Sequence, residues 1–190
     1  MNKKNCTGCG LCASICPKKC IEMKENKEGF IYPVVDTKKC INCKLCEKKC
    51  PLNMNISPNI ESKTYAFQSN NKNELYSCAS GGAFYTIAKY VLDNGGTVIG
   101  VGTNNDLSID FYAVNKKESL NNLLNSKYFQ CELKKNIYLN IKEYLKNGLV
   151  LFSGTPCQVA AIVKYLENDK NKDNLISLEI LCQGAPSYKV

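Results

Sequence analysis

The first 51 residues of the chain contain one cysteine pattern twice. The first copy reads Cys6-x-x-Cys9-x-x-Cys12-x-x-x-Cys16-Pro17, and the second reads Cys40-x-x-Cys43-x-x-Cys46-x-x-x-Cys50-Pro51. Each cysteine of the first copy, and the proline as well, recurs 34 positions later. Three thiolates separated by two residues let a short loop wrap one corner of a metal cluster, so the duplication predicts two clusters in one small domain.

The pattern is that of bacterial two-cluster ferredoxins, in which each motif gives three thiolates to its own cluster and the fourth to the other. One [4Fe–4S] cluster is therefore assigned to Cys6, Cys9, Cys12 and Cys50, and the second to Cys40, Cys43, Cys46 and Cys16. Residues 11–16 and 45–50 are predicted to be short helices, because the proline after each fourth cysteine stops a helix.

Two other uses of cysteine fit the pattern less well. Structural zinc also uses Cys-x-x-Cys pairs, but it takes four ligands rather than two interlocked sets of three plus one. A disulfide framework suits small secreted domains, and we expect no signal peptide, since only five residues precede Cys6. Cys20 lies outside the pattern, and we interpret it as a buried spare thiol. Four further cysteines are scattered along the rest of the chain: Cys78, Cys131, Cys157 and Cys182.

Composition narrows the chemistry that the chain can perform. The 190 residues include no histidine, which excludes Ser-His-Asp and Cys-His catalysis, Cys/His zinc sites and histidine-ligated haem. Free thiols and iron–sulfur clusters both point to a cytoplasmic location, and no apolar run approaches the ~20 residues of a membrane span. The formal charge of +8 falls to about +4 once two cluster sites of about −2 each are counted.

Lysines crowd the cysteine motifs, but no basic helix with interleaved aromatic residues accompanies them. We therefore expect no nucleic-acid partner, and we interpret these charges as tuning the cluster potential or docking an acidic redox protein. The lysines concerned are Lys18, Lys19, Lys38, Lys39, Lys44, Lys48 and Lys49.

The predicted fold is α+β. It comprises a bacterial-type two-cluster ferredoxin domain at residues 1–52, a linker at 53–63, and an α/β domain at 64–190 with a mostly parallel or mixed sheet. In the first domain, residues 21–23 and 30–32 are predicted to pair as a hairpin around Gly29. In the second, strands are predicted at 65–67, 98–101, 110–114, 149–152 and 175–181, and helices at 80–94, 117–125, 133–147 and 158–166, with Ser80 as the N-cap of the first helix.

Ligands of parallel sheets bind beyond the carboxyl ends of the strands, and three turns are candidates for such a place. Two of them follow predicted strands, at residues 153–157 and 182–186, and the third is the glycine-rich helix start at Ser80. Helix N-termini with glycine attract phosphate groups through free N–H groups and the macrodipole. The alternative for each of the three is an ordinary tight turn.

Five short motifs follow one another from Ser77 onward. They are Ser80-Gly81-Gly82-Ala83-Phe84, Gly95-Gly96-x-Val98-x-Gly100, Ser126-Lys127-Tyr128-x-Gln130, Gly154-Thr155-Pro156-Cys157-Gln158 and Cys182-x-Gly184-x-Pro186-Ser187. Together with the ferredoxin motifs, this order resembles the beta subunits of coenzyme F-420 hydrogenase/dehydrogenase over essentially the whole chain. The chain departs from that family at Gln183, where the family usually has histidine.

The resemblance implies an iron–sulfur flavoprotein that moves electrons between clusters, FAD, and a deazaflavin or other reductant. It also implies that two turns approach the flavin, with Ser80, Gly81, Gly82 and Ala83 in one and Gly154, Thr155, Pro156 and Cys157 in the other. Family members continue for about as long again past the Pro-Ser stretch. We therefore expect the α/β domain to be incomplete at its C-terminus, with a further segment or a partner chain completing the pocket.

Two functions of different classes follow from these observations. The first is an oxidoreductase module that passes electrons between two [4Fe–4S] clusters and a flavin, with a small molecule as hydride donor or acceptor. The second is a non-catalytic electron-transfer protein that docks a redox partner through its α/β part. In either case the last predicted strand is apolar nearly throughout, and we expect it to expose apolar surface that favours association.

Overall fold

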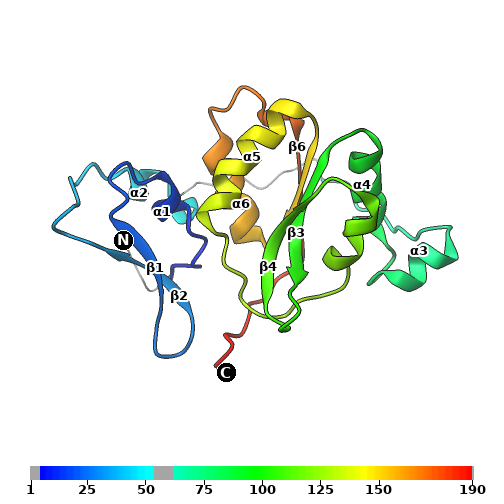
Figure 1. Ribbon diagram of the computed structural model, residues 1–190, viewed down its shortest axis with the longest axis horizontal. Helices are drawn as coiled ribbons and strands as arrows, with labels where there is room; N and C mark the ends of the chain where they lie inside the picture. The colour runs from blue at the N-terminus through cyan, green and yellow to red at the C-terminus, as the bar shows by residue number, and fades with distance from the viewer. Residues whose placement is uncertain (1–4, 54–61, 190) are drawn as a thin grey trace.

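The computed structural model describes residues 5–53 and 62–189, which form two lobes (Figure 1). The N-terminal lobe, residues 5–53, contains α1 (Leu11–Ile15), β1 (Ile21–Glu25), β2 (Ile31–Val35), α2 (Leu45–Lys48) and the 3₁₀ helix η2 (Pro51–Asn53). Strands β1 and β2 pair antiparallel, with Ile21 opposite Val35 and Glu25 opposite Ile31. The predicted hairpin and both short helices are confirmed. The strands are longer than predicted, and the helices are shorter.

The C-terminal lobe, residues 62–189, is built on a four-stranded mixed sheet. Its elements are α3 (Lys72–Ser77), α4 (Ala83–Asp93), β3 (Thr97–Thr103), β4 (Ile109–Val114), the 3₁₀ helix η3 (Lys117–Leu123), α5 (Lys135–Asn147), β5 (Val150–Gly154), α6 (Pro156–Leu166), the 3₁₀ helix η4 (Lys172–Asn174) and β6 (Leu175–Glu179). The strand order is β4-β3-β5-β6, with β4 antiparallel to β3 and with β3, β5 and β6 mutually parallel. The α+β class and the mixed sheet agree with the prediction.

Helices cover both faces of this sheet. Val98 and Leu151, which are register partners on β3 and β5, pack with α4 and η3. Ile99 and Phe152, the next residues along the same strands, point the other way and pack with α5 and α6. This alternation follows from the two-residue period of a strand. Strand β5 is buried along its whole length, as expected for a parallel strand covered on both sides.

The start of α6 is fixed by a capping box. The Thr155 side chain accepts a hydrogen bond from the backbone of Gln158, and the Gln158 side chain accepts one of 2.9 Å from the Thr155 N–H. Pro156 occupies the first turn, where the lack of an N–H costs nothing. The helix therefore begins two residues earlier than predicted, and Cys157 lies in its first turn.

Two predictions near α4 are wrong. Residues 65–67 form no strand; instead this segment crosses Gly81, and the Ser69 N–H donates a 2.9 Å hydrogen bond to the Gly81 carbonyl. Ser80 is not the N-cap of α4, because it adopts a left-handed conformation with φ 54° and Gly82 takes the capping position. The glycines after Ser80 shift the helix start by two residues.

Two further elements differ from the sequence-based expectation. The segment at 117–125 is a 3₁₀ helix, since its first turn has no side-chain cap and Asn122 is engaged by the Thr103 N–H of β3 at 3.1 Å. Helix α3 was not predicted at all. Its N-cap Asn71 accepts hydrogen bonds from the N–H groups of Asn73 and Glu74, which makes a short helix without an apolar stripe possible. The predicted linker lies largely outside the described residues.

Strand β6 is one of the two edges of the sheet. Ile180 and Leu181, which follow it, are 46% and 94% exposed. Within β6, which ends at Glu179 rather than at residue 181, the apolar side chains Leu175, Ile176 and Leu178 are partly buried against the two cores. The exposed apolar surface thus lies in the two residues after the strand, and the expected association stays a prediction. Within the described residues, no helix is both long and apolar enough to cross a membrane.

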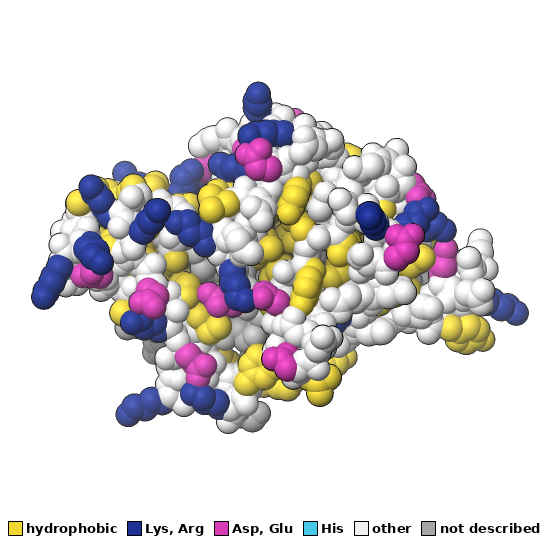
Figure 2. Space-filling model, in the orientation of Figure 1, with side chains coloured by type: hydrophobic (Ala, Val, Ile, Leu, Met, Phe, Trp, Pro, Cys, Tyr) yellow, Lys and Arg dark blue, Asp and Glu magenta, His cyan; other side chains and the backbone are white. Residues whose placement is uncertain are grey.

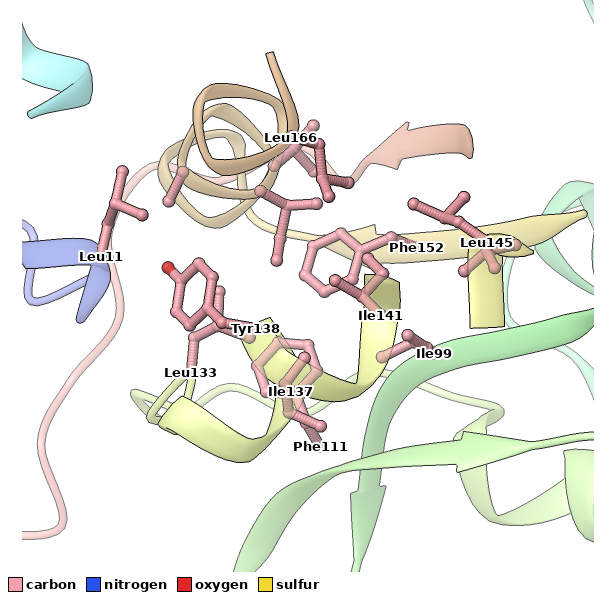
Figure 3. Close-up of a cluster of buried hydrophobic side chains, with 14 of the residues drawn as sticks. Leu11, Ile99, Phe111, Leu133, Ile137, Tyr138, Ile141, Leu145, Phe152 and Leu166 are labelled. Carbon is pink, nitrogen blue, oxygen red and sulfur yellow. The ribbon is translucent and has the colours of Figure 1, made fainter. Parts of the chain in front are cut away.

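The lobes are joined through the core of the C-terminal lobe. Leu11 of α1 is buried in the same cluster as Tyr138 of α5 and Ile162 of α6. Figure 3 shows Leu11 facing Tyr138 from the N-terminal side of this cluster. The Tyr138 hydroxyl donates a 2.7 Å hydrogen bond to the Cys9 carbonyl, and Lys49 forms an ion pair with Glu167 at the end of α6. Hydrophobic burial and a buried hydrogen bond therefore hold the first cysteine motif against α5 and α6.

A second junction fastens the hairpin. The Ile31 N–H donates a 3.2 Å hydrogen bond to Gln130 Oε1, and the Gln130 N–H donates one of 3.0 Å to the Pro186 carbonyl. The Ser187 hydroxyl donates to the Glu28 carbonyl in the β1–β2 turn. Residues that the family resemblance singled out as motifs thus serve, in this structure, to connect the two lobes.

Candidate iron–sulfur centres and the neighbouring turns

The eight motif cysteines are divided between two cavities in the N-terminal lobe. The first cavity has a volume of about 290 Å³. The motif cysteines on its wall are Cys6, Cys9, Cys12 and Cys50. Three come from the first motif and the fourth from the second, because α1 and α2 pack against each other and bring the end of the second motif to the first. This grouping is the one that the crossed ferredoxin pattern predicts.

The second cavity has a volume of about 170 Å³ and is lined by residues of the same lobe. The motif cysteines on its wall are Cys16, Cys40, Cys43 and Cys46. Cys20 also lines this cavity, and its Sγ lies 3.4 Å from the Sγ of Cys16. The interpretation of Cys20 as a buried thiol agrees with its 6% exposure, but it adjoins the second centre and is not remote from it.

Burial dominates the electrostatics of the first cavity. It raises the pKa of the Cys9 thiol to about 11, with smaller contributions from neighbouring thiols that include Cys50 and Cys157, and the Leu11 N–H opposes the shift. Burial likewise raises the pKa of Cys12 to about 12, against the Ala13 N–H. Such thiols lose their protons only when a cation binds them. A set of four thiols around one cavity therefore fits an iron–sulfur core, whose positive charge compensates the thiolates.

At Cys16 of the second cavity, hydrogen bonds together change the thiol pKa more than burial does. Burial raises the pKa of Cys16, but hydrogen bonds from Cys20 and from the N–H groups of Lys18 and Lys19 outweigh it, so the net pKa of Cys16 is lowered. At Cys20 the hydrogen bond with Cys16 is the largest cause, and together with burial it raises the pKa to about 11. N–H groups aimed at a ligand sulfur stabilise its charge and help to set a cluster's potential.

The described residues contain no group of three or more Cys, Asp or Glu side chains placed to hold a single metal ion. A zinc ion needs its ligand sulfurs about 2.3 Å from one point, whereas a cluster spreads its four ligands over a larger core. The preference for clusters over zinc rests on the two sets of four motif cysteines, one set at each cavity. The assignment of each individual cysteine as a ligand stays a prediction.

The turn at residues 154–157 lies beside the first cavity. Cys157, in the first turn of α6, is near enough to Cys9 to influence its pKa, and its Sγ lies 3.2 Å from the Thr155 hydroxyl. Gly154 leaves room for the Gln158 amide, since a Cβ there would lie 3.0 Å from Gln158 Oε1. Gln158 Nε2 also donates a 2.9 Å hydrogen bond to the Cys131 carbonyl. The turn is therefore rigid and adjoins the lobe that carries the cysteine motifs.

The turn at residues 80–83 lies at the same carboxyl edge of the sheet but on the opposite face. Helix α4 runs back along β3, and Phe84 reaches Gly100, so the start of α4 adjoins the end of β3. Gly81 is required by packing alone, because a Cβ there would lie 2.1 Å from the Phe67 carbonyl. The two predicted flavin turns thus share an edge but belong to different helical layers. The third candidate turn, at 182–186, leads towards the junction at Pro186 and Ser187.

Sequence reasoning missed the residues that connect the lobes. Tyr138 was predicted only as a core residue of a helix, and Gln130 and Ser187 only as parts of motifs. Nothing in the helical period of α5 distinguishes Tyr138 from its apolar neighbours, except that a fully buried tyrosine requires a partner for its hydroxyl.

Lys18 and Lys44 line the second cavity, and further lysines lie close to its cysteines in the sequence. Lys18, Lys19, Lys38, Lys44 and Lys48 are exposed, and none of them forms an ion pair with another described residue. Figure 2 shows several lysines gathered on the lobe that carries the cysteine motifs. Cys43 is the one exposed thiol among the motif cysteines, and Ile41 beside it is 56% exposed. The wall of the second cavity therefore carries exposed lysines, here called the lysine rim, together with Glu47, whereas the first cavity is lined by α1, which packs against the C-terminal lobe.

Comparison with known proteins agrees with this geometry. Residues 5–54 match the 4Fe-4S dicluster domain model. An uncharacterized ferredoxin from Methanocaldococcus jannaschii is 32% identical over 53 residues, which cover 28% of this chain and 68% of that protein.

A solved structure of the F420-reducing [NiFe] hydrogenase complex from Methanosarcina barkeri, a xenon derivative, is similar over 70% of this chain, with a TM-score of 0.55 and 16% identity. At this identity the likeness shows the fold alone. The chain spans 50% of the length of the chain that it matches in that complex.

The N-terminal lobe is thus an iron–sulfur module for electron transfer, supported both by the family match and by the division of its thiols between two cavities. Through this lobe, the chain belongs to the ferredoxins with a 4Fe-4S dicluster domain.

Proposed function

We propose that the chain is an oxidoreductase module in which two [4Fe–4S] clusters exchange electrons with FAD held at the carboxyl edge of the sheet. The observation that carries this proposal is the junction at Cys9. The carbonyl of Cys9 accepts the hydrogen bond of Tyr138, and Cys157 of α6 lies close to its thiol. A redox centre in the first cavity would therefore adjoin the turn that the resemblance assigns to the flavin.

The proposed ligand sets follow the two cavities. The first cluster takes Cys6, Cys9, Cys12 and Cys50, and the second takes Cys40, Cys43, Cys46 and Cys16. At the first cluster, the N–H groups of Leu11 and Ala13 stabilise thiolate charge, while the buried Leu11 side chain and Tyr138 keep water from the side that faces α5 and α6. A dry, hydrogen-bonded environment of this kind sets the potential of a cluster.

The proposed flavin residues are Ser80, Gly81, Gly82 and Ala83 before α4 and Gly154, Thr155, Pro156 and Cys157 before α6. When bound, a flavin takes up two electrons as hydride and gives them out singly. The protein's part is to hold it in place. Three parallel strands end at this edge, and α6 directs its N-terminus there, where the helix dipole favours phosphate. The reductant would be a deazaflavin or another small hydride donor or acceptor.

The proposed electron route has a direction. Residues of α1 line the first cavity and pack against α5 and α6 of the C-terminal lobe, whereas the wall of the second cavity carries exposed lysines without described ion-pair partners. Electrons would pass from flavin to the first cluster, then to the second, and leave to an acidic redox protein docked on the lysine rim. A further polypeptide segment or partner chain over β6 would complete the flavin pocket.

One observation favours a second candidate function, in which the chain relays electrons without catalysis. Gly81 and Gly154 both have a packing reason in this structure, the Phe67 carbonyl and the Gln158 side chain respectively, and neither requires a ligand. The C-terminal lobe would then dock a redox partner rather than hold FAD.

Anaerobic purification distinguishes these functions. Both require about eight iron atoms and about eight acid-labile sulfides per chain, as two [4Fe–4S] sites hold. The oxidoreductase also releases a yellow flavin on denaturation, in a ratio near one per chain, or binds added FAD with quenching of flavin fluorescence. Clusters without any flavin binding would leave the relay function, and zinc without sulfide would exclude both.

A further inference from the structure

Five thiols, not four, surround the second cavity. Backbone hydrogen bonds of the β1–β2 hairpin fix the position of Cys20 at this cavity. It directly precedes β1, and its carbonyl accepts a 2.8 Å hydrogen bond from the Asp36 N–H at the end of β2. The Asp36 carbonyl in turn accepts a 3.1 Å hydrogen bond from the Cys40 N–H. The hairpin therefore places Cys20 between the end of the first motif and the start of the second.

The geometry around Cys20 is that of a ligand position. Its side chain is 6% exposed and lies on the cavity wall together with Cys16 and Cys40. Its Sγ lies 3.4 Å from the Sγ of Cys16, in mutual hydrogen-bond contact. Lys19 at φ 50° turns the chain back after Pro17, and its N–H donates a 3.1 Å hydrogen bond to the Cys16 carbonyl. This tight turn makes the two sulfurs neighbours although the two cysteines are four positions apart in the sequence.

We infer that Cys20 is a reserve ligand of the second cluster, which binds the iron of Cys16 when Cys16 is lost or dissociates. The inference rests on the proposed cluster at this cavity. In the exchange, the iron–sulfur bond to Cys16 breaks and one to Cys20 forms, while the proton of the Cys20 thiol passes to the Cys16 sulfur. No electron moves and no other reactant is needed. The two sulfurs already share a hydrogen bond, so the proton has a direct path.

The internal duplication supplies a matched control. The residue 34 positions after Cys16 is Cys50, and the residue 34 positions after Cys20 is Met54. Met54 lies outside the described residues, but its sequence position shows that the second copy carries no thiol there. The second copy thus has an equivalent of Cys16 but no thiol at the position equivalent to Cys20.

The experiment compares alanine variants of the full chain, purified anaerobically, by iron and acid-labile sulfide content and by electron paramagnetic resonance. We expect about eight iron atoms in the wild type, in Cys20→Ala and in Cys16→Ala, since each keeps four thiols at the second cavity. Cys16→Ala/Cys20→Ala and Cys50→Ala are both expected to lose iron and to show the signal of an incomplete three-iron cluster or of a missing cluster.

The outcomes distinguish a failure of the Cys20 inference from a failure of the proposed function on which it rests. If Cys16→Ala loses as much iron as Cys50→Ala while the wild type holds about eight, Cys20 is no ligand and the inference is wrong. A wild type without two clusters overturns the proposed function itself. Full iron in Cys16→Ala, lost again when Cys20 is also replaced, supports the reserve-ligand role.

Discussion

The hydroxyl of Tyr138 donates a 2.7 Å hydrogen bond to the carbonyl oxygen of Cys9, across 129 positions of sequence. This bond connects the fully buried core of the C-terminal lobe with the loop that curves around the first cavity. Burial raises the pKa of Tyr138 well above its ordinary value, with the thiols of Cys9 and Cys12 as smaller causes, so the phenol stays protonated and remains a donor at any physiological pH. The hydrogen bond from Tyr138 to Cys9 is therefore not lost by ionisation of the phenol in the physiological pH range.

Replacing Tyr138 with phenylalanine tests how much this junction contributes. The Cys9 carbonyl would lose a buried donor, which costs about 1–3 kcal/mol. We expect cluster absorbance to bleach at a temperature lower by a few degrees in Tyr138→Phe, since about 1 kcal/mol corresponds to ~2–4 °C for a chain of this size. Tyr144→Phe is the control, because Tyr144 lies on the same helix, partly buried, without a described hydrogen bond from its hydroxyl. Equal midpoints for the two variants would show that the bond adds nothing.

A comparison of alanine substitutions at Gly10 and Gly95 separates the cost of backbone strain from the cost of a steric contact. Both adopt left-handed conformations, with φ 77° and 72°. A Cβ at Gly10 would lie 2.8 Å from the Leu133 carbonyl, whereas one at Gly95 would meet nothing within 4 Å. Gly95→Ala should thus show strain alone, about 1–2 kcal/mol. We expect Gly10→Ala to lose more, because it also forces the lobes apart at α1.

The measurement for this pair is the thermal midpoint followed by circular dichroism, together with limited proteolysis between the lobes. A Gly10→Ala variant as stable and as resistant to cleavage as Gly95→Ala would contradict the close contact at Leu133.

The cysteines and the central strands show which parts of the structure can be predicted from the sequence, and why. Cysteine spacing is a local property, so the grouping of thiols around two cavities and the hairpin between the motifs follow from the pattern. The mixed sheet also followed, because β3 and β5 are continuous apolar runs with strong burial.

The failures share a physical cause, which is a contact far away in sequence. Ser80 has the chemistry of an N-cap, but the Phe67 carbonyl packs against Gly81, and Gly82 takes the N-cap position, so that the helix begins at Ala83. The segment at 65–67 has strand-forming residues but pairs with no strand among the described residues. Likewise, Cys20 is four residues from Cys16 in sequence, and only the turn at Lys19 and the pairing of β1 with β2 bring the two sulfurs to 3.4 Å.

Thiol reactivity should distinguish Cys157 from Cys131. Cys131 is 8% exposed, and burial raises its pKa to about 12. Cys157 is only half-buried and lies in the first turn of α6, where a reagent can reach it more easily than a buried thiol. We expect iodoacetamide to modify Cys157 in the cluster-bearing protein well before Cys131, as read by peptide mass spectrometry. Modification of Cys131 first, or no reaction at Cys157 at all, would indicate that Cys157 is shielded by a ligand or a partner.

Glu132 gives the stability of the chain a defined pH dependence. Burial raises the pKa of Glu132, with Asp110 as a smaller cause in the same direction and Lys134 opposing both. Because the folded-state pKa lies above the unfolded value of 4.5, this group favours the folded state below pH 4.5, and its contribution is lost as the pH rises through the folded-state pKa. Glu132→Gln should therefore raise the thermal midpoint at pH 7.5 more than at pH 5.

The control for this effect is Glu143→Gln, whose carboxylate is 65% exposed beside Lys146. We expect that control to change the midpoint little, and in the opposite direction, since it removes an exposed ion pair. A Glu132→Gln variant that is destabilised at pH 7.5 would mean that its pairing with Lys134 outweighs burial.

The lysine rim of the second cavity should control association with an acidic electron carrier. Lys18 and Lys44 line the cavity itself, are exposed, and have no described ion-pair partner. A flavodoxin with an acidic face around its cofactor is the probe. We expect Lys18→Glu/Lys44→Glu to weaken flavodoxin binding by about tenfold or more at low salt, chiefly through a slower association rate. The difference should shrink at high ionic strength, where charges about 10 Å apart are screened.

The matched control reverses the same charges elsewhere. Lys72→Glu/Lys146→Glu changes the net charge equally but acts on α3 and α5, away from the second cavity (Figure 1). Stopped-flow measurement of flavodoxin reduction and surface-plasmon-resonance binding give two independent readouts, one with the clusters reduced and one without electron transfer. If both double variants weaken binding equally, net charge alone is responsible and the rim is no docking surface. If only the rim variant loses affinity, and does so with an intact cluster spectrum, the second cavity is the face through which electrons leave the chain.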